Sequence, residues 1–223
     1  MIKLTNVRKC YFSGDIETIA LRDVNLQIDA GEFVAIMGPS GCGKSTLMNV
    51  LGMIDSPTRG SYEFDGVDVT TFSESKLVKL RKSSLGFIFQ SFNLIEDMSV
   101  EENITLPLQY MRVPKEERIS RVREALELVG LSHRSSHSVT QLSGGQQQRV
   151  AVARAIIADP KLVLADEPTG NLDSRNGEEV MELLELLNQQ GTTVAMVTHS
   201  EKDAQKAHRI ISVLDGQIVS GAG

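Results

Sequence analysis

The chain has 223 residues, a formal net charge of −6 and 41% hydrophobic residues, values typical of a soluble globular protein with one or two domains. An acidic chain without a polybasic cluster suits neither a nucleic-acid backbone nor direct binding to anionic lipid. No apolar run approaches the ~20 residues of a membrane span, so any membrane association should pass through another protein. The two cysteines form no disulfide framework, which indicates a reducing, cytoplasmic setting.

The first ninety residues have mainly the alternation of β-strands. Segments 2–7, 20–28 and 60–70 alternate apolar and polar residues, and Asp65-Gly66 in the last of them is a turn signal. Segment 32–38 is continuously apolar, as expected of a strand buried on both faces, and a helix is predicted at 45–54.

The middle of the chain has helical periodicity. Ser99 and Glu102 have capping-box spacing before a helix at 99–108. A second helix at 114–130 places Ile119, Val122, Leu126 and Val129 on one face, which we expect to be buried.

After Pro160 buried strands return at 161–166 and 192–199, separated by a helix at 176–191, and a hairpin follows at 209–220 with its turn at Asp215-Gly216. Strand–helix alternation predicts an α/β protein with a mainly parallel sheet. We expect one domain over 1–223. Its β-rich core would comprise 1–90 and 160–223, with an N-terminal antiparallel β part, and residues from about 91 to 159 would form an inserted helical subdomain.

A phosphate-binding loop is the clearest motif. The run GPSGCGKS matches G-x-x-x-x-G-K-[ST] between a predicted strand and a predicted helix, the context that the motif requires. Lys44 is expected to reach the β- and γ-phosphates, and the Ser45 hydroxyl to bind Mg²⁺. The alternative is an ordinary glycine-rich turn. The loop residues predicted to contact a nucleotide are Gly38, Pro39, Ser40, Gly41, Cys42, Gly43, Lys44, Ser45 and Thr46.

Two adjacent carboxylates end the strand at 161–166. Since neighbouring strand residues face opposite ways, Asp166 and Glu167 should have different roles. Asp166 is predicted to hold Mg²⁺ through water, and Glu167 to orient and deprotonate an attacking water. By themselves, two surface acids at a strand end would be an equally good interpretation.

A second glycine pair lies in LSGGQQQR, residues 142–149. Ser143 and Gln146 have capping-box spacing, but a cap does not explain Gly144 and Gly145, which cost up to about 1 kcal/mol each in a helix. Two glycines at a helix start expose backbone N–H groups, which suits a second anion site. The simplest geometry is that this site closes over a nucleotide held by another copy, so that a twofold dimer encloses two ATP molecules.

LSGGQ, GPSGCGKS and LVLADE together closely resemble the ATP-binding-cassette ATPases, the nucleotide-binding subunits of ABC transporters, over essentially the whole chain. The resemblance implies a phosphate-loop NTPase core of the RecA-like type with an inserted helical subdomain. It also implies ATP hydrolysis with Mg²⁺ and a homodimer in which LSGGQ contacts the partner copy's γ-phosphate.

The resemblance assigns further residues. Tyr11 matches the aromatic that stacks on adenine, Gln90 the glutamine that touches Mg²⁺, and Asp173 the loop along the dimer interface. His199 matches the histidine that contacts the γ-phosphate. Without the family, Tyr11 and His199 would be ordinary strand-end residues and Gln90 a polar loop residue.

The resemblance implies separate integral-membrane permease subunits and a cytoplasmic location on the inner face of the membrane. Phe92, Leu94, Ile95 and Met98 are expected to form a partly exposed apolar groove for the permease, although they could instead fill the helical core. The sequence around LSGGQ and LADEPTGNLDS resembles that of the lipoprotein-release, macrolide-export and cell-division branch of the family. This resemblance implies export, extraction or force transmission across the membrane.

Two other classes of function remain. One is a soluble cassette ATPase acting on DNA or ribosomes. Such relatives usually carry two cassettes, zinc cysteines or a long coiled coil, none of which this sequence contains. The other is a small-molecule kinase with a phosphate loop, and LSGGQ argues against it.

Overall fold

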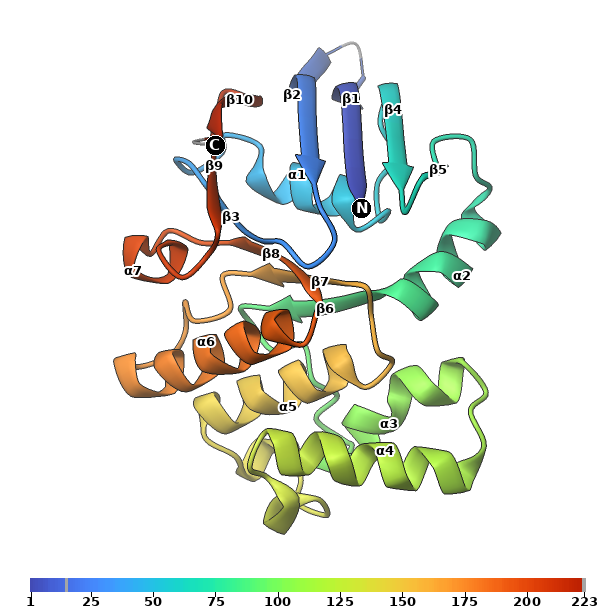
Figure 1. Ribbon diagram of the computed structural model, residues 1–223, viewed down its shortest axis with the longest axis vertical. Coiled ribbons are helices and arrows are strands. Elements are labelled where there is room, and N and C mark those ends of the chain that lie inside the picture. The colour runs from blue at the N-terminus through green and yellow to red at the C-terminus, as the bar shows by residue number, and fades with distance from the viewer. Residues whose placement is uncertain (15, 222–223) are drawn as a thin grey trace. The chain divides into compact units, whose positions relative to one another are not determined.

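The computed structural model describes residues 1–14 and 16–221 (Figure 1). Contacts divide the chain into two compact units. The first comprises Met1–Lys79 with Thr193–Gly223, and the second comprises Leu80–Thr192. Within the described residues, no helix has the length and apolar character that a membrane span requires.

An antiparallel sheet forms one layer of the first unit, with strand order β2-β1-β4-β5. Along β1, Ile2 and Leu4 are buried while Lys3 between them is exposed, so one face packs into the core. Asp65 and Gly66 both have positive φ, 53° and 78°, as a tight hairpin turn requires. The strands are β1 (Ile2–Ser13), β2 (Ile16–Ile28), β4 (Arg59–Phe64) and β5 (Val67–Asp68).

The parallel strands of the first unit are arranged around β3 (Phe33–Met37). It pairs in parallel with β8 (Thr193–Val197) on one side and β9 (Arg209–Leu214) on the other, and β10 (Gln217–Gly221) pairs antiparallel to β9. Residues 33–36 and 193–197 are buried, as expected of strands covered on both faces. The helices of this unit are α1 (Lys44–Leu51) and α7 (Glu201–Ala204).

The second unit combines two parallel strands with a helical cluster. β6 (Leu85–Phe89) pairs in parallel with β7 (Leu162–Asp166). Helices α3 (Val100–Tyr110), α4 (Lys115–Leu128) and α5 (Gly144–Ile156) enclose a core of aliphatic side chains that includes Ile104, Leu126 and Val150. The unit also contains α6 (Ser174–Gln189) and the short 3₁₀ helices η1 (Ser132–Arg134) and η2 (Val139–Gln141). Helix α2 (Glu74–Ser84) contains the junction between the units.

The predicted fold class is confirmed, with an antiparallel N-terminal sheet, parallel strands and a helical segment. The capping box of Ser99 and Glu102 is present. The burial of Ile119 was predicted wrongly, since its side chain is 51% exposed although Val122 and Leu126 are buried. The division into a core and a helical subdomain stays a prediction, because β6, β7 and α6 group with the helices in the second compact unit.

Truncating Ile104 should destabilise the second unit far more than truncating Ile119. Ile104 is fully buried between α3 and its neighbours, so Ile104→Ala should lower the free energy of unfolding by about 2–5 kcal/mol. The exposed Ile119 should change it by less than about 0.5 kcal/mol on truncation. Urea denaturation of both variants measures the difference, and equal losses would contradict the described core.

Candidate functional site

The loop between β3 and α1 adopts a conformation that depends on its glycines. Gly38, Gly41 and Gly43 have φ angles of 156°, 77° and 106°. A Cβ atom at Gly38 would lie 2.2 Å from the carbonyl oxygen of Val213, and one at Gly43 would lie 2.7 Å from that of Ala20. Gly41 has open space around it. The loop is therefore packed on one side and accessible at Gly41.

Lys44 is held across this loop. Its Nζ donates hydrogen bonds of 2.9 Å to the carbonyl oxygens of Gly38 and Pro39, and its side chain is only 7% exposed. Ser45 is exposed and Thr46 half-buried at the start of α1. The Cys42 side chain is buried, so Cys42 can reach a ligand through its backbone alone.

A cavity of about 650 Å³ opens beside the loop, a volume within the usual range for small-molecule sites. The hairpin turn at Asp215-Gly216 forms one wall, and the N–H of Gly216 donates to the carbonyl of Cys42 at 2.9 Å. The turn was predicted as a hairpin but not as part of the site. The loop residues that line the cavity are Gly41, Gly43, Lys44, Ser45 and Thr46.

Tyr11, 42% exposed near the end of β1, is held by two charged neighbours that the sequence analysis missed. Its hydroxyl donates to Asp55 Oδ2 at 2.7 Å, and Lys9, which is ion-paired with Asp55, places Nζ 5.0 Å from the ring centroid. Burial raises the pKa of the Tyr11 phenol, and the bond to Asp55 adds to the rise. Burial alone would raise the pKa of Asp55, but hydrogen bonds from Lys9 and Tyr11 outweigh it and lower the pKa.

His199 follows β8, the parallel neighbour of β3. Ile36 is paired with Val197, and the N–H of Thr198 donates to the carbonyl of Ile36 at 3.2 Å. The first unit therefore brings His199 and Gly38 to the carboxyl ends of adjacent parallel strands.

In the second unit, Gln90 and Asp166 lie at one sheet edge, because Phe89 is paired with Asp166 in the β6–β7 ladder. Gln90 Nε2 donates to Asn171 Oδ1 at 3.1 Å, and Asn171 Nδ2 donates to the Gln90 carbonyl at 3.0 Å. Asn171 was not predicted, although it lies in the GNLD segment that contains Asp173.

Strand β7 ends at Asp166, so Glu167 is the first residue after it. Glu167 has a left-handed backbone conformation, with φ of 45°. The prediction that Asp166 and Glu167 face opposite ways as neighbouring strand residues was therefore wrong in its premise. A non-glycine residue with positive φ is uncommon and strained, and such strain gathers at functional sites.

The signature segment, Ser143–Gln146, begins α5 with the predicted capping box. Ser143 Oγ accepts from the Gln146 N–H at 3.3 Å, and Gln146 Oε1 accepts from the Ser143 N–H at 3.0 Å. A Cβ atom at Gly145 would lie 2.0 Å from Asn176 Oδ1, whereas one at Gly144 would make only ordinary contacts, at 3.7 Å or more. Packing against α6 thus explains Gly145, a reason that the sequence did not show.

Asp173 caps α6, accepting the Asn176 N–H at 2.9 Å and its side-chain amide at 2.7 Å. These bonds lower the pKa of the Asp173 carboxyl. Through Asn176, the start of α6 is connected to the start of α5.

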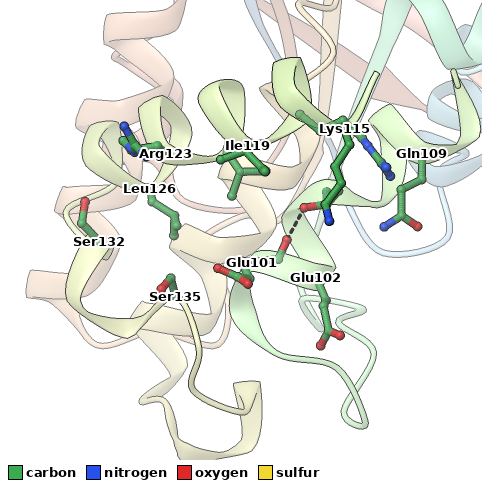
Figure 2. Close-up of a pocket in the computed structure, with 12 residues that line it drawn as sticks. Glu101, Glu102, Gln109, Lys115, Ile119, Arg123, Leu126, Ser132 and Ser135 are labelled. Atoms are coloured by element: carbon green, nitrogen blue, oxygen red, sulfur yellow. Dashed lines mark hydrogen bonds between the residues drawn. The ribbon is translucent and has the colours of Figure 1, made fainter. Parts of the chain in front are cut away.

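A separate cavity of about 580 Å³ lies over α3 and α4 (Figure 2). Glu101 and Glu102 of α3 and Lys115, Ile119 and Arg123 of α4 line it. None of the predicted site residues is among its lining residues, so it belongs to a different surface of the second unit.

A glycine loop between a buried parallel strand and a helix, with a lysine held across it, defines a phosphate-loop nucleotide-binding α/β protein. The family model described as "ABC transporter" matches residues 21–170. The chain belongs to the ABC transporter family, and the predicted family is confirmed.

The relatives fall into two groups by length. The chain is 48% identical over 223 residues to the macrolide export ATP-binding/permease protein MacB of Azoarcus sp. (strain BH72). The match covers 100% of this chain but only 34% of the length of that relative. It is 48% identical over 219 residues to the ABC transporter ATP-binding protein YknY of Bacillus subtilis (strain 168), covering 98% of the chain and 95% of the relative.

Among solved structures, a dimeric post-hydrolysis state of the ATP-binding cassette MJ0796, bound to ADP and phosphate, matches with a TM-score of 0.91. Its sequence identity to the chain is 45%, and the match covers 99% of this chain and 97% of that one. The fold is therefore that of an ABC cassette.

The two glycines of the signature segment should differ in the stability cost of replacement by alanine. Gly145→Ala forces a methyl group into Asn176 and should lower the free energy of unfolding by about 1–3 kcal/mol. Gly144→Ala should change it by less than about 0.5 kcal/mol, since ordinary contact distances remain. Chemical denaturation compares the two, and an equal cost would show that packing against Asn176 is not the reason for Gly145.

Proposed function

We propose that this chain is the ATP-hydrolysing subunit of an ABC transport complex that powers a separate membrane permease. The observation that carries the proposal is the loop Gly38–Thr46, whose glycines, buried lysine and adjoining cavity suit a bound triphosphate. Membership of the ABC transporter family supports the same reading.

Lys44 and the first turn of α1 would hold the phosphates. A helix N-terminus offers N–H groups without intrahelical acceptors and a partial positive charge of about +0.5. Tyr11 would stack on the base with the ring face opposite Lys9, because the Lys9 ammonium occupies the other face. Pro39, Ser40 and the Cys42 backbone complete the loop.

Ser45, Gln90 and Asp166 each carry an oxygen of the kind that Mg²⁺ prefers, a hydroxyl, an amide or a carboxylate oxygen, and they would hold the ion. Gln90 and Asp166 already share one sheet edge. When bound, Mg²⁺ would neutralise charge on the phosphates.

Hydrolysis would depend on Glu167. Its carboxylate would take a proton from water as the water oxygen attacks the γ-phosphorus and the bond to the β-phosphate oxygen breaks, yielding ADP and phosphate. Gln90 would help to orient the water, and His199 would contact the γ-phosphate.

The signature segment would act on a nucleotide held by a second copy, in a homodimer with two ATP molecules at its interface. Gly144 and Gly145 offer N–H groups at the start of α5, and the Ser143 hydroxyl would lie beside them. Gln146 closes the cap by accepting the Ser143 N–H, and Asp173 would lie along the interface. The dimeric state of the MJ0796 cassette supports this arrangement.

The permease would dock on the apolar residues after Gln90. Ile95 is 42% exposed, Phe92 and Met98 are half-buried, and Leu94 packs against the helical core. The chain would then work at the inner face of a membrane, bound through its partner. The macrolide export relative supports export or extraction as the direction.

Replacing Glu167 with glutamine should leave ATP binding intact and slow hydrolysis by about 10²–10⁴, because the base is lost while the shape is kept. The ATP-loaded variant should be a dimer and the ATP-free variant a monomer. Phosphate release and light scattering measure the two effects. A monomer at saturating ATP and Mg²⁺ would contradict the role given to the signature segment.

Placing a charge on the docking surface should uncouple the chain from its permease. In the Glu167→Gln background with ATP, Ile95→Asp should abolish retention of the integral-membrane partner from detergent extracts, while basal ATPase activity in the parent background stays within about twofold. Leu186→Asp, at a 37% exposed leucine of α6, is the matched control and should retain the partner. Retention of the partner by Ile95→Asp would place docking elsewhere.

A further inference from the structure

Gln148 is a fully buried polar residue of α5, with 0% exposure, and it is not part of the predicted site. Its side-chain Nε2 donates to two main-chain carbonyls, that of Pro168 at 2.6 Å and that of Phe89 at 3.3 Å. Both N–H groups of this amide therefore donate to main-chain carbonyls outside α5.

The two carbonyls belong to residues that are adjacent in sequence to two of the proposed catalytic residues. Phe89 precedes Gln90, and Pro168 follows Glu167. Because Phe89 is also paired with Asp166 in the β6–β7 ladder, a single side chain bridges the ends of both strands. Gln148 therefore joins the helix that begins with the signature segment to the peptides on either side of the proposed water-orienting residues.

The orientation of this amide is determined by its surroundings. With the oxygen and nitrogen exchanged, Oε1 would face two carbonyl oxygens, which repel it. In the observed orientation Oε1 is buried and accepts no hydrogen bond from the described part of the chain. The glutamine therefore leaves one buried acceptor unsatisfied while its amide N–H groups satisfy two carbonyls, so its contribution lies in those two bonds.

The backbone next to the Pro168 carbonyl, to which Gln148 donates, is strained. Glu167 has φ of 45° and precedes a proline, which restricts it further. Such a conformation persists only where surrounding contacts hold it, and the short bond to the Pro168 carbonyl is one of them. The start of α5 is itself fixed, because Gly145 packs closely on Asn176.

We propose that Gln148 is a positioning residue, which sets the Glu167 and Gln90 peptides according to the position of α5. When the signature segment engages a nucleotide, a displacement of α5 is passed to Glu167 through this amide. The inference rests on the proposed function, since it assigns a role within the same hydrolysis reaction.

The test is a double-mutant cycle with two replacements. Gln148→Met keeps the length of the side chain but donates no hydrogen bond, and Gln148→Asn keeps an amide that is one methylene shorter. In the parent background, each should lower kcat by about 10–100-fold, because small misplacement of a catalytic group has large effects, while Kd for ATP changes by less than about threefold. In the Glu167→Gln background, the same replacements should lower the residual single-turnover rate clearly less than they lower kcat in the parent, because the Glu167 carboxylate is gone and only Gln90 can still be displaced.

Asn188→Leu is the matched control. Asn188 is a buried amide of the same unit whose Nδ2 donates to the Thr192 carbonyl at 3.0 Å, remote in sequence from Gln90 and Glu167. It should lower thermal stability as Gln148→Met does, and leave kcat within about twofold.

Two results would overturn the inference. One is an unchanged kcat in folded Gln148 variants. The other is a loss of the same size in both backgrounds, as a general packing defect would give. If Gln148→Met does not fold, Gln148→Asn, which keeps a donating amide on a shorter side chain, decides the question. A parent chain that hydrolyses no ATP would overturn the proposed function and this inference together, whereas active parent protein with unaffected variants overturns this inference alone.

Discussion

The carboxyl ends of buried parallel strands are the constraint on which the site depends. A strand covered on both faces can place polar groups only where it ends, and parallel neighbours end at the same edge. In the first unit this brings Gly38 and His199 to adjacent strand ends, and in the second it brings Gln90 and Asp166 together. Each chain reversal there is tight, which accounts for the positive φ of the loop glycines and of Glu167.

A residue in such a site can satisfy a packing requirement and a chemical one at once. Gly145 has no side chain because Asn176 occupies that space, and its N–H also belongs to the first turn of α5, where an anion could bind. The cap formed by Ser143 and Gln146 likewise orders the first turn of α5 whatever that turn binds. The explanation by packing and capping and the explanation by anion binding are therefore compatible for this segment.

Sequence reasoning succeeded where the evidence is local. Strand alternation, the Asp65-Gly66 and Asp215-Gly216 turns and both capping boxes depend on residues within a few positions, and all are present. Helix α2 was missed because its apolar residues are few, and β6 because five residues of LGFIF fit a strand or a buried helix equally well. Ile119 is exposed because it lies towards the start of α4, beyond the apolar core. The roles of Asp55, Asn171 and Gln148 depend on contacts across 44, 81 and 59 positions, which no local pattern contains.

Lys44 shows how the loop can be ready for phosphate before phosphate arrives. Its ammonium already bonds to the carbonyls of Gly38 and Pro39, so the side chain has lost its rotamer freedom in the folded chain. A phosphate oxygen would replace one of these neutral carbonyl acceptors or become a further acceptor for the ammonium. A hydrogen bond between two charged groups is about twice as strong as one between neutral groups. Because Lys44 is only 7% exposed, water screens that attraction weakly. The gain on binding then comes from charge at a preformed position, with little further ordering to oppose it.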